Sequence, residues 1–247
     1  MKTLKRTLVS AMLLTALAAQ AHSSHTGGIH TPANPAIDAA FDIVHTRIAK
    51  QGNYAVFHIA VAGKAGQSRP SKVGTLAGST AFSYVWPTTI DPAAVGFDHN
   101  AGILAFAVTA HPDFDDTPLY DENGDGNLNN DGDLWHSHWV VLKPDDACGK
   151  GKLKVVDIAP GAKPALPRTW PGLPILIDSP GYSPVFNDST LEVRVPFADL
   201  GGRADLGFDG VTAALRVNTS VHSPLLCVAD VFKVASGALT LPGKLGQ

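Results

Sequence analysis

The sequence has 247 residues, 45% of them hydrophobic, and a formal net charge of −3. This composition supports a buried core, and the charge argues against nucleic acid as a partner, because phosphate binding requires a strongly basic surface. No apolar run reaches the length of a membrane span, which excludes a helical membrane protein.

Residues 1–21 have the pattern of a secretory signal peptide. A basic start precedes an apolar stretch over residues 8–19, and the small residues Ala19 and Ala21 flank the expected cleavage site. We therefore predict a bacterial protein exported to the periplasm or the medium. Cleavage removes three basic residues and no acid, so the mature chain carries a formal charge of −6.

Residues 22–36 are polar and contain glycine and proline, which predicts a flexible arm. After cleavage, His22 becomes the first residue. This terminal histidine resembles that of histidine-brace proteins such as the lytic polysaccharide monooxygenases, and the resemblance implies copper bound by the amine and imidazole of His22. Together with His25 and His30, the arm is also typical of looser copper or nickel binding.

Residues 37–247 are predicted to form a single all-β domain, because short apolar segments rich in β-branched and aromatic residues alternate with turn signals. Residues 40–49 and 53–63 read as a hairpin across the turn KQGN. Further strands are predicted at 80–90, 102–111, 134–142, 153–159, 190–197, 211–221 and 226–235. The pattern indicates an antiparallel β-sandwich with Greek-key connections, immunoglobulin-like or jelly-roll-like.

The segment 113–133 holds eight acidic residues and no Lys or Arg. Within it, oxygen-bearing side chains recur at every second position around Gly126: Asp121, Asn123, Asp125, Asn127 and Asn129. This pattern is how a short loop surrounds one hard cation, and it resembles the first nine positions of EF-hand and dockerin calcium loops. The resemblance implies a backbone oxygen from Asn127 and side-chain oxygens from the other four.

The loop then departs from those families. Their bidentate acid at the twelfth position is replaced by Gly132, and a strand is predicted to follow instead of a helix. We expect Asp131 or Asp133 to complete a calcium shell. The alternative is a solvated acidic turn without an ion.

The strand at 134–142 places His136 and His138 on one face, with Trp135 and Trp139 on the other. Two imidazoles at this spacing can reach one transition ion such as copper or zinc. The string HSHW also resembles the zinc strand of α-type carbonic anhydrases, although no motif for their third histidine is found. The alternative is a pair of structural, hydrogen-bonded histidines.

A third ligand is predicted at His111, because this residue ends the strand 102–111 and the acidic loop returns the chain toward His136.

In an exported chain, Cys148 and Cys227 are expected to form a disulfide. No catalytic or organic-cofactor motif is found, which makes an enzyme less favoured than a binding protein.

Three functions remain open. The first is metal binding or handling outside the cytoplasm, with calcium in the loop and copper or zinc at the histidines. The second is a calcium-dependent carbohydrate-binding or adhesion module for a polysaccharide or a cell-surface partner, using Trp86, Trp135 or Trp170. The third is a zinc- or copper-dependent enzyme.

Overall fold

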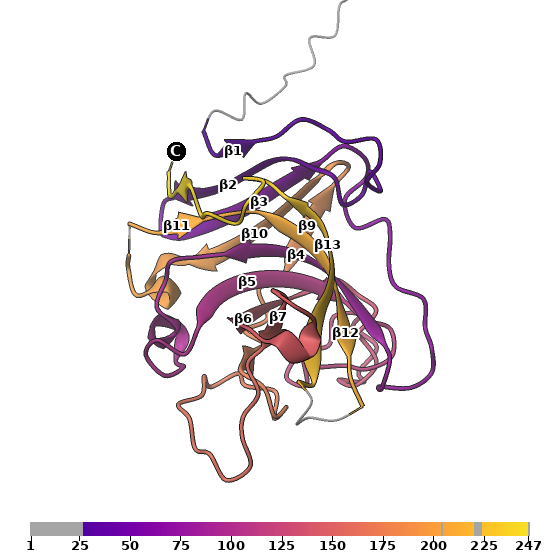
Figure 1. The fold of residues 1–247 in the computed structure, drawn as a ribbon. Coiled ribbons are helices and arrows are strands. Elements are labelled where there is room, and N and C mark those ends of the chain that lie inside the picture. The colour runs from indigo at the N-terminus through magenta and orange to yellow at the C-terminus, as the bar shows by residue number, and fades with distance from the viewer. Residues whose placement is uncertain (1–26, 204, 220–223, 247) are drawn as a thin grey trace, which may run out of the picture.

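The computed structural model describes residues 27–203, 205–219 and 224–246. The chain is all-β and antiparallel, as predicted (Figure 1). The predicted signal peptide, His22 and His25 lie outside the described residues. The helical segments in the described ranges are short 3-10 turns: η1 (Pro92–Val95), η2 (Asp146–Cys148) and η3 (Phe197–Leu200).

Six strands close into a barrel in the order β5–β4–β12–β13–β7–β6, with β6 pairing back onto β5. The barrel strands are β4 (Thr80–Pro87), β5 (Ile103–Ala110), β6 (His136–Pro144), β7 (Leu153–Val155), β12 (Val211–Val217) and β13 (Leu226–Val234). A short strand, β8 (Ile177–Asp178), adds to β6.

A separate five-stranded sheet lies across one side of the barrel (Figure 1). Its strands, in spatial order, are β1 (Ile29–His30), β2 (Ile43–Gln51), β3 (Tyr54–Val61), β10 (Thr190–Pro196) and β9 (Pro184–Asn187). The predicted hairpin is formed by β2 and β3. A two-stranded ribbon of β11 (Gly207–Phe208) and β14 (Gly243–Lys244) completes the described elements.

Barrel strands β4, β5 and β6 are buried on both faces, which explains why their sequences read as nearly continuous apolar runs. On β5, Leu104 and Phe106 face the core between barrel and sheet, while Ala105 and Ala107 belong to the core inside the barrel. The alternation of strand side chains therefore separates two cores. The inner core is the one that positions the candidate site.

The sequence pattern indicates two facing sheets, and the structure adds a closure that this pattern does not contain. The second layer is a ring because β5 pairs with both β4 and β6. Closure of the barrel depends on pairings between strands that are distant in sequence, such as β4 with β12. The alternation of side chains within one strand does not specify which strands pair with it.

The predicted disulfide is present: Cys148 and Cys227 are bonded, with their Cα atoms 5.4 Å apart. It links η2 to β13, which adjoins β7 at the barrel seam. Over the described ranges, no helix has the length and apolar character needed to cross a membrane.

Candidate metal centre

Three histidines meet at one end of the barrel interior. In the β5–β6 ladder, His136 lies opposite Thr109 and His138 lies opposite Ala107. His111 follows two residues after Thr109, so strand alternation directs it to the same face. The structure therefore brings together His111, His136 and His138, the three residues selected from the sequence for a transition metal.

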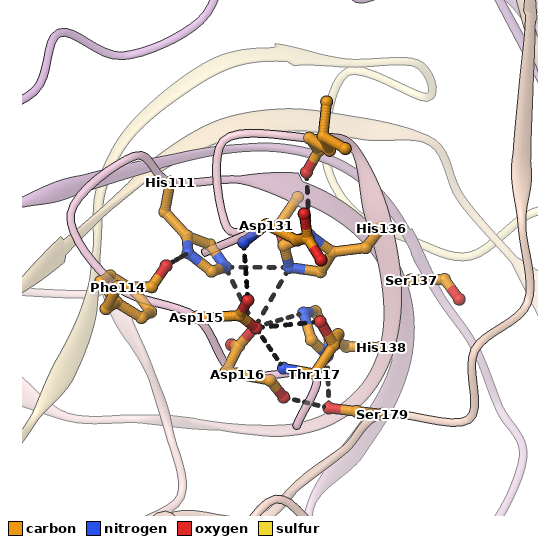
Figure 2. A network of polar contacts seen from close by, with 12 residues as sticks. His111, Phe114, Asp115, Asp116, Thr117, Asp131, His136, Ser137, His138 and Ser179 are labelled. Atoms are coloured by element: carbon orange, nitrogen blue, oxygen red, sulfur yellow. Dashed lines mark hydrogen bonds and ion pairs between the residues drawn. The ribbon is translucent and has the colours of Figure 1, made fainter. Parts of the chain in front are cut away.

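The fourth member of the group is Asp116, which the sequence analysis did not select as a ligand. It lies on the loop that connects β5 to β6, five residues after His111, and is 5% exposed. Its carboxylate points at the three imidazoles (Figure 2). The sequence offered only one signal for it, its closeness to His111, and seven other acids in the same segment obscured that signal.

The donor atoms of the four side chains converge. Asp116 Oδ1 lies 3.2 Å from His111 Nε2, 3.1 Å from His136 Nε2 and 3.2 Å from His138 Nε2. The Nε2 atoms of His111 and His136 are 3.0 Å apart, and all four donor atoms lie within 4.8 Å of one another. Within the described ranges, this is the one group of three or more His, Cys, Asp or Glu side chains whose donors converge in this way.

Hydrogen bonds fix the tautomer of each imidazole. His111 Nδ1 lies 2.9 Å from the carbonyl oxygen of Phe114, and His136 Nδ1 lies 2.8 Å from that of Leu134. Because a carbonyl oxygen only accepts, both Nδ1 atoms carry the proton. In the neutral rings, each Nε2 therefore presents a lone pair to the centre.

The same holds for His138 through a relay. The hydroxyl of Ser179 donates to the backbone carbonyl of Asp116 at 2.7 Å, so its oxygen accepts from His138 Nδ1 at 3.1 Å. Second contacts of this kind orient metal-binding histidines and set their tautomer. Within the described chain, His138 Nε2 and Asp116 Oδ1 are buried without a hydrogen-bond partner despite their closeness.

The charges within the group are strongly coupled. Burial disfavours the charged form of Asp116, but His138, His111 and His136 outweigh burial and hold its pKa well below the usual value. Burial also opposes the charge on His111, and attraction to Asp116 outweighs it, so the pKa of His111 is raised. Burial lowers the pKa of His136 to about 4, with further lowering from its two histidine neighbours. Near neutral pH, Asp116 is therefore an anion and His136 a neutral ligand.

A cleft of about 450 Å³ opens to the surface beside the group. It is lined by Arg69, Glu122 and Trp135 among others, and His136 is the one member of the group among its lining residues. A buried metal site needs such a path for the ion.

In the acidic loop, the side-chain oxygens predicted to bind calcium accept hydrogen bonds from the loop backbone. Both oxygens of Asp121 accept backbone amides, from Gly124 and Gly126 at 2.7 Å each. Asn123 Oδ1 accepts the amide of Asp125, and Asp125 in turn accepts that of Asn127 at 2.8 Å. These oxygens line a tight turn, as the calcium pattern implies, but they already have donors from the loop itself.

The two residues expected to complete the calcium shell differ in burial. Asp131 is fully buried and accepts the amide of Glu122, whereas Asp133 is exposed. Asn129 is exposed, and its amide donates to Asn127 Oδ1. Calcium binding at residues 121–133 stays a prediction.

Gly132 explains why the loop lacks the acid of EF-hand loops at this point. A Cβ on Gly132 would lie 1.7 Å from the carbonyl oxygen of Phe114 and 2.7 Å from that of His111. The carbonyl of Gly132 also accepts the amide of His111 at 2.6 Å. Only glycine fits here without a shift of the turn that holds the His111 tautomer.

The tryptophans considered for carbohydrate binding do not form an exposed platform. Trp86 is 0% exposed and Trp135 is 8% exposed, with the latter donating to the carbonyl of Gly66. Trp170 is half-buried and donates to the carbonyl of Leu173.

Comparisons with protein-family models, curated proteins and solved structures find no match for this chain.

Proposed function

We propose that this chain is an exported metal-binding protein that holds one zinc ion at His111, Asp116, His136 and His138. One observation carries the proposal: the hydrogen bonds assign a proton to every Nδ1, so that each imidazole, in its neutral form, aims the Nε2 lone pair at the point where a carboxylate oxygen also lies. Such electron-rich atoms repel one another at 3.0–3.2 Å unless a proton or a metal cation lies between them, and a bound zinc ion would take the place of the proton that Asp116 favours on His111.

The size of the group favours zinc. Four of the six distances between donor atoms are 3.0–3.2 Å and all six are within 4.8 Å. A tetrahedron with edges of about 3.2 Å has its centre roughly 2.0 Å from each corner, which is the length of a zinc–imidazole bond. Copper also prefers imidazole, and it is the alternative ion for this set of donors. Four protein donors leave no open position of the kind found in catalytic zinc sites, which favours metal binding over metal-dependent catalysis.

Export and calcium belong to the same proposal. A disulfide between Cys148 and Cys227 is compatible with an oxidising compartment, the periplasm or the medium. Calcium at residues 121–133 is supported by the turn of Asp and Asn oxygens and by the eight acids, whose mutual repulsion a divalent ion reduces.

Metal analysis tests the zinc proposal. Untagged protein purified without chelator should contain one zinc per chain, and His138→Ala should contain none. His99→Ala is the matched control, because the His99 side chain is 83% exposed and lies outside the cluster. Equal zinc content in all three proteins would contradict the proposed site, and stoichiometric copper would change the ion assigned to it.

The arm provides an independent control. A variant lacking residues 22–26 removes His22 and His25 while keeping the whole cluster. We expect its zinc stoichiometry to match that of the parent, because all four proposed donors lie outside the deleted residues. If this deletion alone abolishes stoichiometric binding, the arm holds the metal instead.

A further inference from the structure

The interior of the barrel contains a cavity of about 100 Å³. It exists because small side chains face inward on neighbouring strands: Ser83 on β4 lies opposite Ala213 on β12, and Ala81 and Ala107 also line the space. The rest of the wall is mostly valine and leucine from β6, β7, β12 and β13.

One end of this cavity is the candidate metal centre. His111, Asp116 and His138 line it, and His138 shares the inner face of β6 with Val140 and Leu142. The cavity and the cleft are thus lined by different members of the cluster, since His136 is the member that lines the cleft.

One edge of the cavity lies on β13, near the seam between β13 and β7. In the described chain these strands pair through Cys227 and Lys154 alone. Val231, further along β13, lines the cavity and is 53% exposed. A small molecule therefore has an apolar route into the barrel beside a seam held by the disulfide of Cys227.

We propose that the barrel interior binds one small, uncharged, apolar molecule of about the size of benzene, which enters past Val231 and rests beside His138. A dry apolar cavity of roughly 150 Å³ is known to take up benzene or xenon, and the cavity here, at about 100 Å³, suits an occupant at the small end of this class. A charged ligand would lose its hydration in a wall that offers few polar atoms. This inference goes beyond metal binding and does not depend on it.

A titration of the full-length, zinc-loaded protein with benzene tests the proposal. The readout is the amide chemical shifts of the residues that line the cavity, and acetate serves as a small charged comparator. We expect saturable shifts with benzene and none with acetate. Ala213→Leu fills the cavity and should weaken benzene binding at least tenfold. Absence of saturable benzene binding, or acetate binding as tight as benzene, overturns the proposal.

Val231→Trp tests the entrance without filling the core, since Val231 is half exposed. Its matched control is Val185→Trp, on an exposed valine of β9 in the other sheet. We expect slower benzene exchange in Val231→Trp and parental exchange in Val185→Trp, and equal exchange in both overturns entry at the seam. Loss of benzene binding at full zinc content counts against the cavity alone, whereas benzene binding without any zinc counts against the metal site alone.

Discussion

The histidine cluster and the acidic loop are both rich in metal-binding side chains, yet they differ in what their donor atoms already contact. In the cluster, the outer nitrogens of the histidines are hydrogen-bonded and the inner ones converge on Asp116. In the loop, the oxygens of Asp121 and Asp125 accept amides of the same loop. Density of ligand residues is therefore a weaker guide to a site than the direction in which a buried framework holds them.

Zinc should give the largest effect on stability. At a free zinc concentration about 1,000 times the Kd, the free energy of unfolding should rise by about 4 kcal/mol relative to chelator-treated protein. Denaturant unfolding with and without zinc measures this, for the parent and for His138→Ala. An equal response of the two proteins would show that zinc acts somewhere other than the cluster.

Gly132→Ala should be the most disruptive single substitution where the loop meets the cluster. The added Cβ collides with the carbonyl of Phe114, and we expect a loss of about 3 kcal/mol in stability together with weaker zinc binding. Gly124→Ala is the control within the loop, because a Cβ there meets nothing within 4 Å, although its positive φ of 73° adds some strain. Parental stability and zinc affinity in Gly132→Ala would contradict the structural role.

Calcium, added at a lower multiple of its Kd than zinc, should give a smaller stabilisation. At about 100 times its Kd, calcium should add roughly 2.7 kcal/mol through the 121–133 loop. Melting temperatures in calcium and in a calcium chelator, compared for the parent, Asp125→Ala and the exposed-acid control Asp98→Ala, measure this. If calcium shifts none of these melting temperatures, the loop is a solvated acidic turn, and the contrast with the cluster becomes sharper.

Ser179→Ala should weaken zinc binding about 10- to 100-fold, the usual cost of losing a residue that orients a metal ligand. The serine hydroxyl holds both His138 and the backbone of Asp116. Ser183→Ala, on an exposed serine nearby in sequence, should leave affinity unchanged. Competition titration with a zinc chelator provides the measurement, and a parental Kd in Ser179→Ala would argue against the relay.

Zinc affinity should rise with pH. Asp116 raises the pKa of His111, so in the metal-free protein His111 keeps its proton at higher pH than a free histidine, and zinc must displace that proton. At pH values below the raised pKa of His111, the Kd for zinc should fall about tenfold for each unit by which the pH rises, for each proton displaced. Asp116→Asn, which removes the charge that holds the proton, should flatten this dependence while weakening binding. A Kd independent of pH in the parent would contradict the coupling.

Much of the local structure could be predicted from the sequence. The segments selected at 80–90 and 102–111 contain β4 and β5, and the segment 134–142 covers all of β6 except its last two residues, because short apolar runs bounded by turn residues report burial directly. The short strands β1, β8, β9, β11 and β14 were not predicted, since two to four residues carry too little pattern. The disulfide was predicted from the expected export of the chain and from the cysteine count, and the structure contains it.

The sequence by itself determined that the chain is antiparallel β and that His136 and His138 share a face, because alternation is a property of a single strand. Tertiary structure alone decided the closure of the barrel, the choice of Asp116 among eight acids and the tautomers of the three histidines. These depend on contacts between residues distant in the chain, such as His138 with Ser179, 41 positions apart. A local pattern specifies which way a side chain points, whereas its partner is set by how the strands pair and pack.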